Sequence, residues 1–475
     1  MAALSILTVK FVAMGLTKEL AGNYNSAYGF LQLFGILADF GLYAVAVREV
    51  ARAPEQSSVR GKPDGSKQSE VLGALIVLRC AILVLSLATA LLLVWIIPAW
   101  RGTPLPLAVT IASLVPFFTL MAGIVRTVFQ VKYKMHYVFI AEVVQRIFTT
   151  AMIGSFIFLG VRGSNDLQIL HMFLFIGGMG AFILFFMSLI YGNRLMRIRM
   201  HFDLEMLKRL LKAATPYGLA FLFMAFYRQF DITLIALLRD DFELQNAYYG
   251  FVLRMVEMGY LIPTFLLNST LPILSERSAN GGDTKSLLGK TFLIILILGS
   301  VSFLFSILWS RPLIQLLTTD AYLSTATRAG SDTALRLMSV PIFLNGIIAY
   351  SFYVLLTKHE WRKLVAMLLV GAVFSLGLNL WLIPQYGFQG AATVSIIVHC
   401  FLAAMLLPLA LRTMPMHLPK EQWMRWGAFT SLLAGALWAY QPYLTNEFAT
   451  VFALVSVTIL MGVLGLLCGF RKTLL

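Results

Sequence analysis

Nine charged side chains interrupt apolar runs that are long enough to cross a lipid bilayer. A charge at the bilayer centre costs at least ~2.5–3.5 kcal/mol on insertion scales, so such residues line a polar path or pair with one another. Four basic residues are candidates for binding a phosphate: Lys10, Arg79, Arg146 and Arg228. Five others are candidates for ion coupling or ion pairs: Asp39, Glu142, Asp231, Arg254 and Glu257.

The chemistry of these groups leaves two interpretations open. Guanidinium matches a phosphate bidentately, and a buried acid can carry a proton or a cation. Alternatively, the charges form satisfied ion pairs that fix helix packing. The driving force is a separate question: either an acid such as Asp39 or Glu142 couples a cation or proton, or the membrane potential acts on the moving charge. Arg126 and Arg336 lie near the ends of spans, where long basic side chains are expected to reach the interface.

The composition defines the class of protein that holds these charges. Of the 475 residues, 59% are hydrophobic and 12% are charged, about half the charged fraction of a soluble domain. This is typical of an all-α polytopic membrane protein. The net charge of +15 lies mainly in short loops beside the apolar runs, which is a topology signal and argues against a nucleic-acid partner.

Span counting predicts about fourteen transmembrane helices. Their centres lie near residues 9, 37, 84, 117, 149, 180, 226, 260, 300, 346, 373, 400, 432 and 459. Alternate loops hold 24 and 6 basic residues, and the positive-inside rule makes the richer set cytoplasmic. Both termini are then cytoplasmic, which agrees with an even number of spans.

A polar connection divides the spans into two sets of six. It contains a predicted amphipathic helix, Asp203 to Lys212, which we interpret as an interfacial segment or a plain linker. Tyr28-Gly29-Phe30 and Tyr249-Gly250-Phe251 open the second span of each set, as a parallel repeat predicts. The predicted organisation is an N-lobe over 1–192, a cytoplasmic linker over 193–215, a C-lobe over 216–411 and two further helices over 412–475.

Topology sorts the nine charges by depth. At about 1.5 Å rise per residue, five of them fall in the inner half of the first lobe and sum to +1. These are Lys10, Asp39, Arg79, Glu142 and Arg146. Four fall in the outer half of the second lobe and sum to zero. These are Arg228, Asp231, Arg254 and Glu257.

Other kinds of site are not indicated. Cys80, Cys400 and Cys468 lie inside apolar runs and lack metal-ligand spacing. No nucleotide-binding glycine loop and no nucleophile–base pairing is recognisable, so we expect neither a cofactor nor ATP hydrolysis by this chain.

Several short motifs resemble one family. The segments Tyr28-Gly29, Leu37-Ala38-Asp39-Phe40-Gly41-Leu42, Arg48-Glu49 and Ala51-Arg52 resemble the second helix of the polysaccharide-transport (Wzx-type) flippases. Leu207 to Thr215 followed by Pro216-Tyr217-Gly218 resembles the start of that family's seventh helix. The stretch from Asn379 through Ile383-Pro384, Tyr386-Gly387 and Gly390-Ala391-Ala392 resembles its turn between helices eleven and twelve.

The resemblance implies two six-helix lobes around a central cavity, and alternating access. The function it implies is flipping of a lipid-linked oligosaccharide across the bacterial cytoplasmic (inner) membrane, with glycosyltransferases and a polymerase of the same pathway as possible partners. The protein would be a transporter that contacts membrane lipid, and not an enzyme. One alternative is a cation-coupled multidrug antiporter, whose cavity would be mainly acidic. A lower alternative is a membrane-embedded glycosyltransferase or ligase, which would carry a large loop with catalytic acids or histidines.

Overall fold

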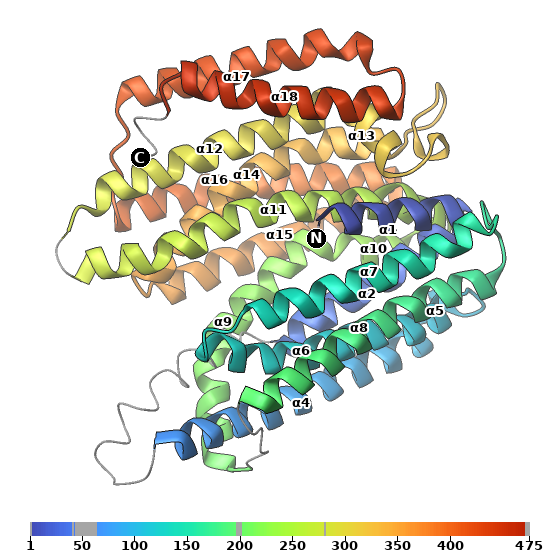
Figure 1. The fold of residues 1–475 in the computed structure, drawn as a ribbon, viewed down its shortest axis with the longest axis horizontal. Coiled ribbons are helices and arrows are strands. Elements are labelled where there is room, and N and C mark those ends of the chain that lie inside the picture. Colours follow the sequence, from blue (N-terminus) through green and yellow to red (C-terminus); the bar gives the residue numbers. More distant parts are fainter. Residues whose placement is uncertain (1, 40–41, 43–63, 196–201, 280–281, 471–475) are drawn as a thin grey trace. The chain divides into compact units, whose positions relative to one another are not determined.

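The computed structural model describes residues 2–39, 42, 64–195, 202–279 and 282–470, and these are almost entirely α-helical (Figure 1). Some predicted features lie outside the described residues. They are the motif residues Phe40, Gly41, Arg48, Glu49, Ala51 and Arg52, and positions 196–201 of the linker.

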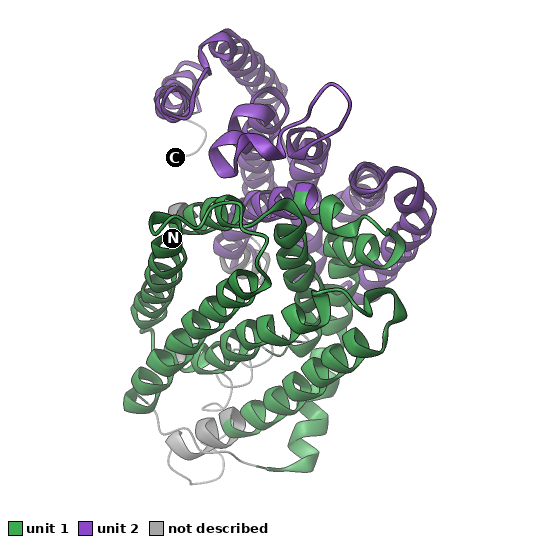
Figure 2. Cartoon of the chain, turned by 90° about the vertical axis from the view of Figure 1, so that its right-hand side faces the viewer, with its two compact units in different colours: residues 1–247 green, residues 248–475 purple. Residues whose placement is uncertain are grey.

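The chain divides into two compact units, residues 1–247 and 248–475 (Figure 2). Within each unit, the residues pack mainly against one another. This division does not test the predicted lobes, which were defined by an internal repeat and stay a prediction.

The first unit contains α1 to α10 and the first residues of α11. The bounds are α1 Ala2–Gly15, α2 Lys18–Asp39, α4 Asp64–Ile96, η1 Pro98–Trp100, α5 Leu105–Ala112, α6 Leu114–Val131, α7 His136–Phe158, α8 Leu167–Leu195, α9 Leu204–Gln229, α10 Asp231–Leu238 and α11 Phe242–Ala279.

The second unit contains the rest of α11 and the helices after it. The bounds are α12 Thr284–Leu308, α13 Ser310–Leu317, η2 Asp320–Tyr322, α14 Ser331–Thr357, α15 Trp361–Tyr386, α16 Phe388–Thr413, α17 Lys420–Tyr440, η3 Gln441–Tyr443 and α18 Glu447–Leu467.

The prediction of a polytopic all-α membrane protein is confirmed. Among the described residues, 11 helices are long and apolar enough to cross a membrane. The other three predicted spans correspond to α1, which is short, and to α2 and α17, which are more polar. Each of the fourteen predicted centres falls inside a helix. Large apolar side chains are exposed on many of these helices, such as Phe448 at 90% and Phe452 at 74% on α18, as expected for surfaces that face lipid.

The predicted amphipathic helix is the beginning of α9 and not a separate element. Asp203 caps α9, because its carboxylate accepts from the backbone N–H of Glu205 and Met206. Leu210 then packs in a cluster with Leu75 and Leu78 of α4, which holds this segment against the helices of the first unit. The helix continues through Pro216.

The turn between α15 and α16 has the geometry that its sequence demands. Gly387 adopts φ +55°, which favours glycine, and it separates the two helices. A Cβ placed on Gly390 would lie 2.4 Å from the carbonyl oxygen of Leu382. These residues therefore support the fold of the second unit.

Candidate functional site

A buried arginine joins α4 to α2 in the first unit. Arg79 Nη2 donates to the carboxylate of Asp39, and the two side chains are 9% and 34% exposed. Farther along the same pair of helices, Ser86 Oγ donates to the carbonyl oxygen of Phe34 at 2.8 Å. The two contacts fix the antiparallel register of α2 and α4, so the Asp39–Arg79 pair has a defined place between them.

A third helix approaches the same guanidinium. A Cβ placed on Gly123 of α6 would lie 3.2 Å from Arg79 Nη2, so the glycine leaves the space that Arg79 occupies. Arg79 Nε is buried and has no hydrogen-bond partner in the part of the chain that the structure describes. A guanidinium carries five N–H donors, so this nitrogen can still donate to an anion.

A second arginine, Arg126, lies on α6 one turn after Gly123. Arg126 Nη2 donates to the carboxylate of Glu142 on α7, and the side chains are 38% and 28% exposed. Residues three apart on a helix share a side, so Gly123 and Arg126 face similar directions. Arg126 therefore does not simply extend toward the interface, as its position near a span end led us to expect. It belongs beside the predicted inner set of charges.

The remaining two members of that inner set lie on neighbouring helices. Lys10 of α1 is half-buried, and Arg146 of α7 is exposed, one turn beyond Glu142. The helices α1 and α7 pack closely, because the hydroxyl oxygens of Thr8 and Thr150 are 2.8 Å apart. With Arg126 included, the set has four basic and two acidic residues, a formal net charge of +2. It comprises Lys10, Asp39, Arg79, Arg126, Glu142 and Arg146.

The predicted outer set is divided between the two units. Arg228 lies in the last turn of α9 in the first unit. Asp231 begins α10, and its side chain accepts from the N–H of Ile232 at 3.0 Å. Arg254 and Glu257 are half-buried on α11 in the second unit, three residues apart. Each is placed within its own unit, and the predicted grouping of the four stays a prediction.

An apolar groove lies beside the Asp39–Arg79 pair. Its volume is about 310 Å³, and it is lined by Phe34 and Leu37 of α2, Ile82, Leu85, Ser86 and Thr89 of α4, and Leu211 of α9. Arg79 precedes Ile82 by three residues and Ser86 by seven, spacings that share one side of a helix. The α4 part of the groove therefore begins at Ile82, about 4.5 Å beyond Arg79 by helical rise, and extends to Thr89, about 15 Å beyond it. The lining suits hydrocarbon.

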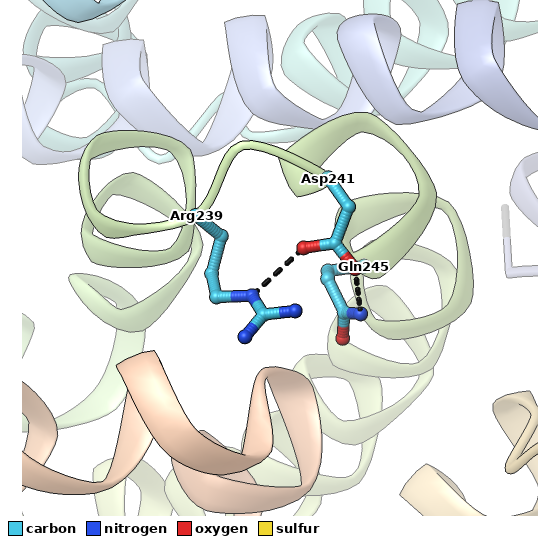
Figure 3. Close-up of polar contacts among 3 residues, drawn as sticks. All are labelled: Arg239, Asp241 and Gln245. Atoms are coloured by element: carbon cyan, nitrogen blue, oxygen red, sulfur yellow. Dashed lines mark hydrogen bonds and ion pairs between the residues drawn. The ribbon is translucent and has the colours of Figure 1, made fainter.

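A charged turn separates α10 from α11. Arg239 Nε donates to Asp241 at 2.7 Å, and Gln245 Nε2 donates to the other oxygen of the same carboxylate at 2.7 Å (Figure 3). Burial opposes ionisation of Asp241, but the hydrogen bonds from Arg239 and Gln245 outweigh it and lower the pKa of Asp241. The hydrogen bond to Asp241 raises the pKa of Arg239. Both charges are therefore maintained, and they stabilise the start of α11.

A match to a family model shows which family this chain belongs to. Residues 1–278 match a family described as polysaccharide biosynthesis protein. The chain belongs to this family. A search of curated proteins finds no match.

Several solved structures share the fold of this chain. The lipid II flippase MurJ in an inward closed conformation aligns with a TM-score of 0.65 and 15% identity over 99% of both chains. A multidrug resistance MATE family transporter of the MOP superfamily in an inward-facing conformation aligns at 0.67 and 14% identity, over 87% of this chain and 94% of the other. A MOP superfamily transporter from Pyrococcus furiosus aligns at 0.53 and 14% identity, over 86% and 95%.

The sequence identified the charged residues but not all of the residues that contact them. It singled out Asp39, Arg79 and Glu142, and two of these three are joined in one ion pair. It did not identify Gly123 as the residue that makes room for Arg79, nor the bond between Arg126 and Glu142. One signal was available for Arg126, because Glu142 lies in the next span and needs a positive partner.

Proposed function

We propose that this family member flips a lipid-linked oligosaccharide from the inner to the outer leaflet of a bacterial cytoplasmic membrane. The substrate would be an intermediate of an exported or surface polysaccharide. Family membership and the shared fold of a lipid II flippase support this proposal. Transport would proceed by alternating access of two lobes, residues 1–192 and 216–411, with both termini in the cytoplasm.

The observation that carries the proposal is the buried guanidinium of Arg79. A lipid-linked sugar carries a phosphate or pyrophosphate, and Arg79 has a buried Nε donor that the described residues leave without an acceptor. Its bond to Asp39 keeps the charge compensated when no substrate is bound. An incoming phosphate would take the place of Asp39 as the partner of Arg79, or share the guanidinium with it.

The surrounding charges favour an anion over a cation. Arg126, Lys10 and Arg146 are further basic residues on neighbouring helices, and the set has a net charge of +2. This balance supports an anionic substrate and argues against a multidrug antiporter with a mainly acidic cavity. Asp39 and Glu142 would act as exchangeable counter-ions, and either is a candidate for coupling a cation or a proton.

The apolar groove along α4 would bind the hydrocarbon part of an amphiphilic substrate. Its lining of Phe34, Leu37, Ile82 and Leu85 suits a hydrocarbon chain, and its α4 part begins about 4.5 Å of helical rise beyond Arg79. An anionic head at Arg79 and a chain in the groove would orient the substrate along α4. Glycosyltransferases that make the sugar and a polymerase that extends it would be the partners in the same pathway.

Flipping of a polyprenyl-pyrophosphate-linked oligosaccharide in proteoliposomes tests the proposal. We expect Arg79→Ala to reduce the flipping rate at least about tenfold, because a charged hydrogen bond to phosphate contributes ~1.5–3 kcal/mol. Arg425→Ala is the matched control, since Arg425 also bonds an acid, Glu421, but on α17 outside the site. Unchanged flipping by Arg79→Ala would remove the site assignment, and absence of flipping by the wild type would remove the proposed substrate.

A further inference from the structure

Buried asparagines join α2 to α10 and to the first residues of α11, all within the first unit. Asn246 is fully buried, and its Nδ2 donates to Ser26 Oγ at 2.9 Å and to the carbonyl oxygen of Ile232 at 3.0 Å. Asn25 Nδ2 donates to the carbonyl oxygen of Asn246 at 3.2 Å. Asn23 Nδ2 donates to the carboxylate of Glu243 at 2.9 Å. We call this set the asparagine contact.

Glycines bring the helix backbones unusually close at the asparagine contact. A Cβ placed on Gly22 would lie 1.6 Å from the carbonyl oxygen of Glu243, and one placed on Gly29 would lie 2.5 Å from Ile232 Cγ2. The two glycines are seven residues apart and therefore lie on one side of α2. At these two points α2 has no side chain, so the backbone of α11 and the side chain of Ile232 pack directly against the backbone of α2.

The asparagine contact also leaves several acceptors unsatisfied. The side-chain oxygens Oδ1 of Asn23, Asn25 and Asn246, and Oγ1 of Thr233 on α10, are buried and have no hydrogen-bond partner among the described residues. A buried acceptor without a donor loses the hydrogen bond that water would give it. Water that enters when the contact opens can donate to these acceptors.

The position of the contact relates it to transport. The helix α2 begins at Lys18, and α10 ends just before Arg239, two residues in the loops that are poor in basic residues and hence predicted to be extracytoplasmic. The helix α2 belongs to the predicted N-lobe, whereas α10 and α11 belong to the predicted C-lobe. Alternating access requires the two lobes to part on each side of the membrane in turn.

We propose that the asparagine contact is the extracytoplasmic gate of this transporter, closed in the described structure and opened to water when substrate leaves. This inference rests on the proposed function. It explains why polar side chains such as Asn25 and Asn246 are buried between these helices. It also explains the four acceptors that lack donors.

Disulfide trapping tests the gate. In a background with Cys80, Cys400 and Cys468 replaced by Ala, the pair Ser26→Cys/Asn246→Cys should cross-link on oxidation and reduce flipping at least about tenfold, with recovery on reduction. The control pair is Thr8→Cys/Thr150→Cys, whose hydroxyl oxygens are 2.8 Å apart within the predicted N-lobe. Its oxidation should leave flipping within about twofold of the reduced protein, because no lobe motion separates α1 from α7. Efficient cross-linking of the first pair with undiminished flipping would overturn the proposal.

A second readout does not depend on the lipid-linked sugar. In the same background, a single Asn25→Cys variant should react with a membrane-impermeant thiol reagent added outside spheroplasts, although Asn25 is 2% exposed in the closed structure. Labelling supports an opening contact even if the substrate assignment fails. A folded variant that stays unlabelled over many hours overturns the gate, whatever the flipping assay shows.

Discussion

Gly123 of α6 lies directly against the guanidinium of Arg79 on α4, with 3.2 Å between Arg79 Nη2 and the place where a Cβ would be. Gly123 therefore forms part of the surface against which the charged side chain of Arg79 packs. Asp39 bonds the same nitrogen, Nη2, so Arg79 cannot move far without breaking that bond. The absence of a side chain at position 123 therefore helps to determine where the positive charge lies.

Larger residues at position 123 should displace Arg79. We expect Gly123→Leu to reduce flipping at least about tenfold, and Gly123→Ala to have a smaller effect, since a side-chain tip can shift by a few tenths of an ångström. Gly35→Ala is the matched control, because nothing lies within 4 Å of a Cβ at that position of α2. A Gly123→Leu protein that elutes as a monodisperse peak and flips normally would contradict the role of the glycine.

Removing the charge of Asp39 should have opposite effects on stability and binding. In Asp39→Asn, Arg79 loses its counter-ion, and we expect the apparent melting temperature to fall by a few degrees, which corresponds to ~1 kcal/mol. The same change removes a competitor for the guanidinium, so binding of a lipid-linked pyrophosphate should tighten severalfold. Thermal melting in detergent measures the stability, and titration with the lipid-linked pyrophosphate measures the affinity. Glu421→Gln, which removes the partner of Arg425 on α17, should leave the affinity unchanged.

The turn between α10 and α11 should contribute a pH-dependent stability. The pKa of Asp241 is lowered in the folded protein, so its contribution is present above the unfolded value of about 3.9 and is lost as pH falls through the lower folded pKa. Because the side chain is 40% exposed, we expect less than about 1 kcal/mol. Melting curves of wild type and Asp241→Asn should converge at acidic pH and differ at neutral pH. The exposed neighbour Asp240, changed to Asn, is the control.

The helices could be predicted because lipid imposes a simple pattern. Each span must be long and apolar, so hydropathy alone placed all fourteen centres inside helices. The charged candidates could be predicted for the same reason, since a charge in an apolar run stands out. The fusion of residues 203–212 into α9 was missed, because Pro216 suggests a break and the packing of Leu210 on α4 is not visible in a local pattern.

Partners across helices could not be predicted from local spacing. Glu142 bonds Arg126 on the preceding helix, a pairing that no spacing within a single helix indicates. The asparagine contact joins positions about 220 apart in sequence, such as Asn23 and Glu243, and none of its members is charged except Glu243. Uncharged polar residues near a span end resemble ordinary loop residues, so only the packed structure distinguishes them.

Because α2 and α11 approach closely at Gly22, a methyl group added at this position should weaken the contact between them. Gly22→Ala would place a Cβ 1.6 Å from the carbonyl oxygen of Glu243, an overlap with backbone that no side-chain rotation can relieve. We expect the closed contact to be destabilised by about 1–3 kcal/mol, as for overpacking elsewhere. If the contact is a gate, the variant should shift toward the open state, and Asn25→Cys should then be labelled faster from outside in the Gly22→Ala protein. A purely structural contact predicts a lower melting temperature in Gly22→Ala without faster labelling. The ratio of labelling rates with and without Gly22→Ala therefore separates a gate from a fixed contact.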